Sequence, residues 1–295
     1  MTRDHPMPPI AAVAVGIAIF SAMDGFMKSA SIEGGVYMAL LARSVIGTGI
    51  MLPVWLVFAR RTPSREAIRL HVVRSVVVSG MALLFFWGLV RLPMAEAMAL
   101  SFIAPLIALY LAAVMLGERI HANAVIASVF GLGGVCVIAS AHFGENATGG
   151  PGSVAGIGAV LASAVLYAWN LILQRRQALV AGPVEVALAQ HLFVGMCLLI
   201  AAPWLLTAPT TMLLRHSGGA AVLAAVSLML LSWGYSRAEA QRLVPMEYSG
   251  FIWAALFGWL WFGERLTLVT LAGTALILAG CWIGARRPAE IGTAP

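Results

Sequence analysis

Residues 84–91 read Leu-Phe-Phe-Trp-Gly-Leu-Val-Arg, and residues 230–237 read Leu-Leu-Ser-Trp-Gly-Tyr-Ser-Arg. The two stretches lie 146 residues apart and share a leucine, a Trp-Gly pair and an arginine at matching positions. The same offset places Gly117-Glu118-Arg119-Ile120 on Gly263-Glu264-Arg265-Leu266. The chain therefore consists of two related halves, and this duplication decides the predicted fold.

The composition places both halves in a membrane. Of the 295 residues, 61% are hydrophobic and 10% are charged, whereas a soluble domain averages about 45–50% apolar and about 25% charged residues. These values exclude a soluble globular enzyme, a disordered chain and a disulfide-stabilised secreted domain. Cys136, Cys197 and Cys281 stand within apolar runs without metal-ligand spacing, so we interpret them as core residues.

Ten apolar segments are each about as long as the roughly 20 residues that a membrane-spanning helix needs. They cover residues 10–30, 36–58, 72–90, 95–116, 122–141, 153–173, 184–206, 218–236, 243–262 and 267–285. We therefore expect an all-α membrane protein with ten transmembrane helices. The connections between the segments are too short for a sizeable domain outside the membrane.

The duplication predicts an inverted 5+5 repeat, with a first repeat over residues 10–141 and a second over residues 153–285. Because five spans is an odd number, the second repeat enters the membrane from the opposite side. Inverted repeats recur in secondary transporters, which bind their substrates near the midplane between the halves. A passive helix bundle left by an old gene duplication is the alternative interpretation.

The basic residues predict that both termini are cytoplasmic. With the N-terminus inside, 13 arginines fall on the cytoplasmic side, Arg74 among them, against four basic residues outside. Cytoplasmic loops of membrane proteins carry such an excess of basic residues. The net charge of +6 thus follows from the orientation, and we expect no nucleic-acid partner.

Three ionisable residues lie inside the first two spans, where a charge costs about 2.5–3.5 kcal/mol. Asp24 and Lys28 stand one helical turn apart in the first span, and Arg43 stands in the second. With a turn near Glu33-Gly34, Asp24 and Arg43 are expected at similar depth. An aspartate flanked by two cations suits a substrate carboxylate. The alternative is a closed salt-bridge network that allows the hairpin to insert.

Other candidates for substrate binding or coupling are polar and aromatic residues in or near the spans. Glu96 and Glu247 stand near the starts of the fourth and ninth spans, where a carboxylate also favours a helix N-terminus. Glu118 and Glu264 are interpreted as interfacial anchors. An aromatic ring can stack on an organic solute, although packing is the commoner role of any single ring. The remaining candidates are Trp87, Tyr167, Trp169, Asn170, His191, Trp233 and Tyr248.

Two local patterns predict helix geometry. Pro105 in the middle of the fourth span is expected to kink that helix, because proline lacks a backbone N–H and clashes with the preceding turn. Small residues spaced four apart, Ala127 and Gly131 in the fifth span and Gly280 and Gly284 in the tenth, permit close helix contact. We interpret this spacing as packing within one molecule.

The order and spacing of these motifs resemble the drug/metabolite transporter superfamily, in proteins with two EamA domains. The resemblance covers nearly the whole chain. It implies a central cavity whose path is lined by spans 1, 3, 4, 6, 8 and 9, with spans 5 and 10 at the periphery. The sequence departs from the pattern in the sixth span, where Asn170 and Gln174 align with Asp24 and Lys28. The residues that carry the resemblance are 23–28, Arg43, 92–97, 102–106, 116–119, 248–255, Gly258, Trp259, Gly263 and Glu264.

The resemblance implies a secondary transporter of the bacterial inner membrane that exports a small organic metabolite by alternating access. An amino acid or an amino-acid-derived zwitterion, such as an opine metallophore of the pseudopaline type, is the expected substrate, and proton coupling is left open. Uptake of S-adenosylmethionine or riboflavin is the alternative within this class.

Other functional classes find little support in the sequence. The chain contains no Walker, HExxH or GxSxG motif, so we expect no enzyme activity, no catalytic residues, no cofactor and no metal. An intramembrane enzyme and a channel are the alternatives from other classes. The expected partners are a small-molecule substrate and the lipid bilayer, and the expected state is a monomer or a weak homodimer.

Overall fold

The computed structural model describes residues 7–59, 62–108, 111, 122–142, 152–238, 243 and 246–285, and all regular secondary structure in them is helical. Five helices are long and apolar enough to cross a membrane: α1 (Met7–Gly34), α2 (Val36–Phe58), α3 (Arg65–Leu89), α7 (Ser153–Val180) and α10 (Thr211–Tyr235). The shorter helices are α4 (Met94–Ser101), α6 (Ala122–Ser140), α8 (Pro183–Leu199), α9 (Ala202–Leu205), α12 (Ser249–Phe262) and α13 (Leu268–Ala285).

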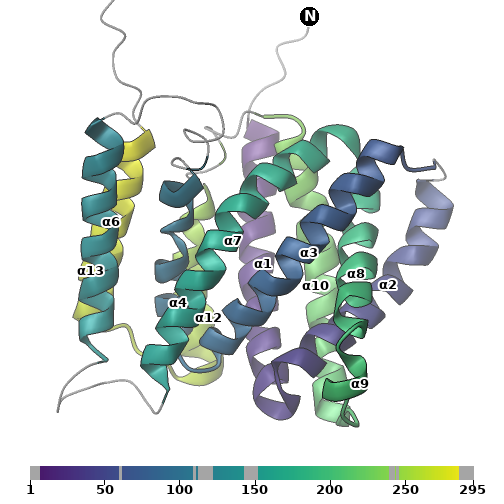
Figure 1. Ribbon diagram of the computed structural model, residues 1–295, viewed down its shortest axis with the longest axis horizontal. Helices are drawn as coiled ribbons and strands as arrows, with labels where there is room; N and C mark the ends of the chain where they lie inside the picture. The colour runs from purple at the N-terminus through teal and green to yellow at the C-terminus, as the bar shows by residue number, and fades with distance from the viewer. Residues whose placement is uncertain are drawn as a thin grey trace, which may run out of the picture.

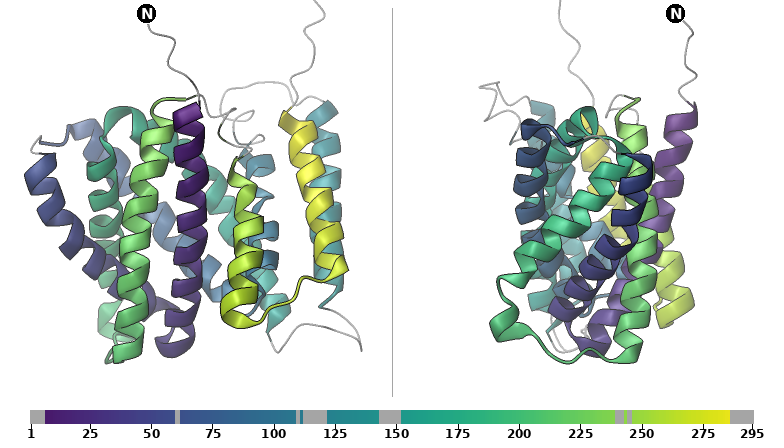
Figure 2. Two further views of the ribbon diagram at one scale, coloured as in Figure 1. Left: turned by 180° about the vertical axis from the view of Figure 1, so that it is seen from behind. Right: turned by 90° about the vertical axis from the view of Figure 1, so that its right-hand side faces the viewer.

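The helices stand side by side in one bundle, and helices that follow one another in the chain run in opposite directions, as in α1, α2 and α3 and again in α7, α8 and α10 (Figure 1). The start of α1 and the end of α13 lie on the same side, which we name the termini face (Figures 1 and 2). On the opposite side, Gly35 joins α1 to α2, and we name this side the hairpin face. Gly35 has φ of 83°, a backbone conformation that glycine adopts without steric cost.

Two helix pairs at the middle of the bundle are built by the same duplicated glycine. A Cβ at Gly88 of α3 would stand 2.7 Å from the carbonyl oxygen of Gly156 in α7. Its repeat mate Gly234 of α10 packs in the same way against α1, where a Cβ would stand 3.2 Å from the carbonyl oxygen of Pro9. Figure 2 shows α1 and α10 side by side from behind. Both halves thus use a glycine to bring two backbones together.

The pair formed by α6 and α13 lies at one end of the molecule (Figure 1). A Cβ at Gly280 would stand 2.6 Å from the carbonyl oxygen of Ala127 and 3.1 Å from the backbone nitrogen of Gly131. The predicted close contact within the molecule is therefore confirmed for these three residues. Cys136 is exposed, contrary to the expectation of a core residue, because it stands on the side of α6 away from this contact.

The fourth predicted span is broken near Pro105, as expected. Helix α4 ends at Ser101, and the backbone N–H groups of Phe102 and Ile103 bond to carbonyls three residues back. The proline ring would clash with the carbonyl of Ser101 in a continuous helix, which explains the break at this place.

Several span boundaries differ from the prediction. Helix α7 ends at Val180 rather than at residue 173, and α10 starts at Thr211 rather than at residue 218. Helix α3 starts at Arg65 rather than at residue 72, because the hydroxyl of Ser64 accepts a hydrogen bond from the Ala67 N–H (3.0 Å) and caps the helix. Helix α8 stops at Leu199, short of Pro203. Helix α12 starts at Ser249 rather than at residue 243. The predicted motif Gly117-Glu118-Arg119 lies outside the described residues.

Candidate functional site

A buried group of charged and polar side chains lies where α1, α2 and α8 meet. Asp24 of α1, Arg43 of α2 and His191 of α8 are 2%, 7% and 2% exposed. Arg43 interacts electrostatically with both Asp24 and His191. The His191 ring fits against α2 because Gly47, one turn after Arg43, has no side chain there. We name Asp24, Arg43 and His191 the central cluster.

The central cluster keeps polar atoms without protein partners. Asp24 Oδ1, Arg43 Nε and His191 Nε2 are buried and make no hydrogen bond to any described residue. The Arg43 guanidinium instead contacts the sulfur of Met23 (3.4 Å) and lies 5.9 Å from the Phe86 ring centre. Unpaired polar groups are costly inside a protein and cluster at functional sites. These unpaired atoms make the central cluster the candidate site for a polar or charged solute.

Lys28 does not join Asp24, which corrects the prediction of an aspartate flanked by two cations. The Lys28 Nζ lies 2.5 Å from Oε1 of Glu264 and donates to the carbonyl of Leu92 at 2.7 Å. The second oxygen of Glu264 accepts from the Met94 N–H at 2.7 Å. Glu264, interpreted as an interfacial anchor, is instead part of a partly buried ion pair that ties α1 to the loops before α4 and α13.

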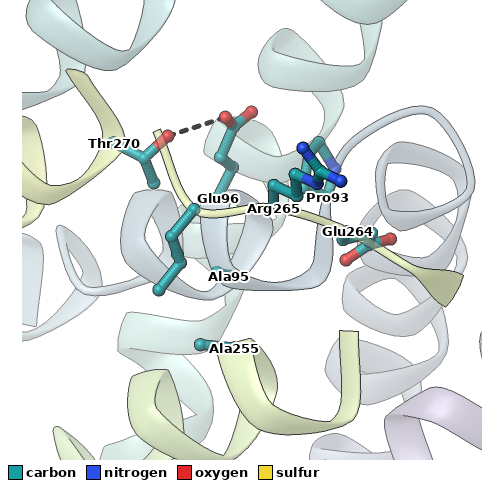
Figure 3. Close-up of a pocket in the computed structure, with 8 residues that line it drawn as sticks. Pro93, Ala95, Glu96, Ala255, Glu264, Arg265 and Thr270 are labelled. Atoms are coloured by element: carbon teal, nitrogen blue, oxygen red, sulfur yellow. Dashed lines mark hydrogen bonds between the residues drawn. The ribbon is translucent and has the colours of Figure 1, made fainter. Parts of the chain in front are cut away.

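Glu96 is used for packing between helices. Its carboxylate accepts from the Thr270 hydroxyl (2.8 Å; Figure 3) and lies 2.9 Å from Nε2 of His142. The three side chains therefore attach α4 to the α6–α13 pair. The hollow beside Glu96, Arg265 and Thr270 in Figure 3 has a volume of about 10 Å³. That volume admits about one water molecule, so the hollow is too small for an organic substrate.

A second carboxylate, Glu247, is held by two tyrosines. The Tyr167 hydroxyl of α7 donates to Glu247 at 3.1 Å, and the Tyr235 hydroxyl of α10 donates to its other oxygen. Tyr248 packs edge-on against Phe102 of the α4 break, with ring centres 5.3 Å apart. Two predicted candidates, Tyr167 and Glu247, are therefore brought together.

Asn170 and Gln174 bind an arginine from the first half. The guanidinium of Arg74 donates to Asn170 at 2.9 Å, to Gln174 at 3.3 Å and to the side-chain oxygen of Gln177. Arg74, counted among the cytoplasmic arginines, is only 3% exposed, because α3 starts early and carries it into the bundle. His71 lies 3.0 Å from Glu185 and completes this network at the α3–α7–α8 contact.

The tryptophan candidates take different positions. Trp169 is 46% exposed. Trp87 and Trp233 are repeat mates, and each stacks with the arginine four residues later. Arg91 lies 3.5 Å from the Trp87 ring centre, and Arg237 lies 4.4 Å from the Trp233 ring centre.

A cavity of about 680 Å³ opens near the hairpin face, which is within the size range of small-molecule sites, roughly 300–1,000 Å³. We name it the hairpin-face cavity. Ser31 of α1 lines it seven residues after Asp24, and Val36 of α2 lines it seven residues before Arg43. Seven residues are two helical turns, so each pair shares a helix face at about 10 Å separation. The other lining residues are Gly35, Tyr37, Leu83, Leu84, Trp87, Val90, Arg91 and Ala159.

Comparison with known proteins gives matches over nearly the whole chain. The model of the EamA-like transporter family matches residues 7–140 and 154–285. The chain is 26% identical over 269 residues to the pseudopaline exporter CntI of Pseudomonas aeruginosa, covering 89% of this chain and 90% of that protein. It is 29% identical over 213 residues to an uncharacterized transporter of Helicobacter pylori, covering 69% of each.

A crystal structure of another protein has the same fold, with a TM-score of 0.62 and 19% identity over 95% of this chain and 100% of the other. The family match, the relatives and the apolar helices agree on a multi-pass membrane transporter rather than an enzyme. Because the family model matches both halves in turn, the chain belongs to the EamA-like transporter family.

Proposed function

We propose that this protein is a secondary transporter that exports a small organic zwitterion, an amino acid or a compound derived from one, across the bacterial inner membrane. The observation that carries the proposal is the central cluster, in which buried Asp24 and Arg43 keep unpaired polar atoms two helical turns above a substrate-sized cavity. The relatives described as pseudopaline exporters support export as the direction.

In this proposal, the two charges of a zwitterion meet the two charges of the central cluster. Asp24 accepts hydrogen bonds from the substrate ammonium group, and Arg43 donates to the substrate carboxylate. His191 contributes a third polar atom on the α8 side. Such pairing compensates both buried side chains at once, which an uncharged solute of the same size cannot do.

The proposed topology has ten spans in two inverted halves, residues 10–141 and 153–285, with both termini in the cytoplasm. It is supported by the alternating helix directions and by the shared face of the two helix ends (Figures 1 and 2). The duplicated contacts of Gly88 and Gly234 support the two-fold relation between the halves. The hairpin-face cavity then opens toward the periplasm. During alternating access this cavity closes and a cavity at the termini face opens to the cytoplasm.

Counterflow in proteoliposomes tests the proposal. Liposomes loaded with a pool of amino acids and amino-acid conjugates are expected to exchange one of them against its labelled form. Asp24→Asn and Arg43→Ala should each reduce this exchange at least about 10-fold, because each variant loses one charge-assisted contact with the substrate. Both variants should still insert into the membrane. Exposed Glu66→Gln and Arg69→Ala, on the termini-face end of α3, are the matched controls and should retain exchange.

Two outcomes would contradict this assignment. Exchange at the wild-type rate in both central-cluster variants would reduce Asp24 and Arg43 to a structural role. Absence of counterflow for every compound in the pool would contradict the proposal of a zwitterion transporter.

A separate measurement addresses coupling. Proton-coupled export should slow when the pH gradient is collapsed, whereas transport by a facilitator should be unaffected.

A further inference from the structure

The hairpin-face cavity contains one charged side chain, and that side chain is held in a fixed orientation. The Arg91 guanidinium stacks on the Trp87 indole with 3.5 Å to the ring centre. One of its nitrogens, Nη1, donates to the Trp87 carbonyl at 2.7 Å. The stack and the hydrogen bond together fix the plane of the guanidinium. A fixed, planar guanidinium is suited to bidentate binding of a carboxylate.

The rest of the lining leaves this positive charge uncompensated. None of the ten residues that line the cavity is acidic, and no described carboxylate forms an ion pair with Arg91. Ser31 lines the cavity, and its hydroxyl is buried without a hydrogen-bond partner. The hydroxyl of Tyr37 is already used, because it donates to the Leu198 carbonyl at 2.8 Å.

The remaining surface of the cavity is apolar or aromatic, with Leu83, Leu84, Val36 and the rings of Tyr37 and Trp87 around it. One guanidinium, one free hydroxyl and an apolar wall match a ligand with a carboxylate at one end and an apolar body. A cation would be repelled by the charge of Arg91, and a highly polar sugar would meet one guanidinium and one free hydroxyl in an otherwise apolar lining.

The duplication places a second copy of the stack at the other end of the bundle. Trp233 and Arg237 are the repeat mates of Trp87 and Arg91, and Arg237 Nη1 donates to the Trp233 carbonyl at 3.3 Å. Helix α3 ends at the hairpin face and α10 ends at the termini face (Figure 1). A stacked Trp-Arg pair therefore lies near each of the two faces that alternating access opens in turn.

We propose that the hairpin-face cavity is a binding site for organic carboxylates, in which Arg91 binds the carboxylate on a Trp87 platform and Ser31 donates to it. Arg237 on Trp233 is the counterpart at the termini face. The assignment of this site to the transport path rests on the proposed function. The binding chemistry itself rests only on the geometry of the cavity.

Protection of a cysteine in the cavity wall tests this proposal without knowledge of the natural substrate. The three native cysteines, Cys136, Cys197 and Cys281, are replaced by serine or alanine, and Ala159→Cys is introduced. The rate of its reaction with N-ethylmaleimide is measured in the purified full-length protein. The probes are phenylacetate and phenylacetamide, which have similar shape and differ in charge.

Phenylacetate is expected to slow the labelling of the cysteine introduced by Ala159→Cys at concentrations about 10-fold lower than those that phenylacetamide requires. A difference in affinity of about 10-fold is what one hydrogen bond to a charged group contributes. Arg91→Gln should abolish this difference, and Arg91→Lys should retain part of it because the charge remains without the planar fork. Arg69→Gln, at an exposed position near the start of α3 and away from the cavity lining, is the matched control and should leave protection unchanged. An unchanged labelling rate without probe verifies that each variant is folded.

Equal protection by the two probes, no protection by either, or full protection in Arg91→Gln would each overturn the carboxylate site. The counterflow experiment distinguishes this failure from a failure of the proposed function. If protection depends on the charge of the probe and on Arg91 but no compound shows counterflow, the binding site is supported and the proposed transport function is contradicted. Counterflow that persists unchanged in Arg91→Gln would keep the transporter and contradict the role of Arg91 in its path.

Discussion

Among single residues, the pair of Lys28 and Glu264 shows most clearly how a buried charge is compensated in this protein. The two side chains come from opposite halves of the chain and are 6% and 17% exposed. Glu264 also accepts a backbone N–H and Lys28 also donates to a backbone carbonyl. Asp24, one helical turn before Lys28, has no such partner for Oδ1. The ion pair of Lys28 and Glu264 thus ties the two halves together, whereas Oδ1 of Asp24 stays unpaired among the described residues.

The variant Lys28→Met should therefore destabilise the protein without a specific effect on substrate recognition. Removing one partner of a buried ion pair costs about 3–5 kcal/mol, because the other charge is left unpaired. The double variant Lys28→Met/Glu264→Gln should recover most of this loss, since the glutamine oxygen still accepts the Met94 N–H. Melting of the purified protein in detergent measures both effects, and a single variant that melts like the wild type would contradict this role.

Between elements, the glycine contacts of α3 with α7 and of α1 with α10 hold the two halves together. Gly88 and Gly234 are related by the 146-residue offset, and each removes a Cβ from a place where another helix backbone approaches. Helix association in a membrane depends on such close approach, since lipid tails provide no hydrophobic driving force between helices.

Gly88→Ala should accordingly destabilise the protein by about 1–3 kcal/mol, the usual cost of overpacking. A Cβ at this place would stand 2.7 Å from the Gly156 carbonyl oxygen, so α3 and α7 must separate. Gly158→Ala in α7 is the control, because a Cβ there meets nothing within 4 Å. Thermal unfolding compares the two. Equal melting temperatures would show that the α3–α7 contact tolerates separation.

For the whole molecule, the orientation in the membrane follows from the proposed topology and can be measured. Glu33 at the hairpin face and Thr62 before α3 are both exposed. In a variant without native cysteines, a membrane-impermeant maleimide should label Glu33→Cys in intact bacterial cells. Thr62→Cys should react only after permeabilisation. The reverse pattern would place the termini outside and invert the proposed direction of the hairpin-face cavity.

How much of the candidate site was predictable depends on how far apart in sequence its members stand. Asp24 and Arg43 belong to one helical hairpin, so their residue spacing around the turn predicted that they approach each other. Arg74 and Asn170 stand in different halves, and no spacing rule connects them. Tyr235 was also missed, although it directly follows the Trp-Gly pair of the repeat. Its hydrogen bond to Glu247 depends on the rotation of α10 about its axis.

The sequence by itself determined the membrane location, the two related halves and the places where helices can approach or must break. These properties follow from composition, from the 146-residue repeat and from the local geometry of glycine and proline. Only the tertiary structure decided that Lys28 pairs with Glu264, that Arg74 is buried against α7, and that Arg91 faces a cavity. The reason is physical: contacts between the halves depend on how each helix is rotated and inclined against its neighbours. Those angles result from the packing of the whole bundle and are not encoded in any one segment.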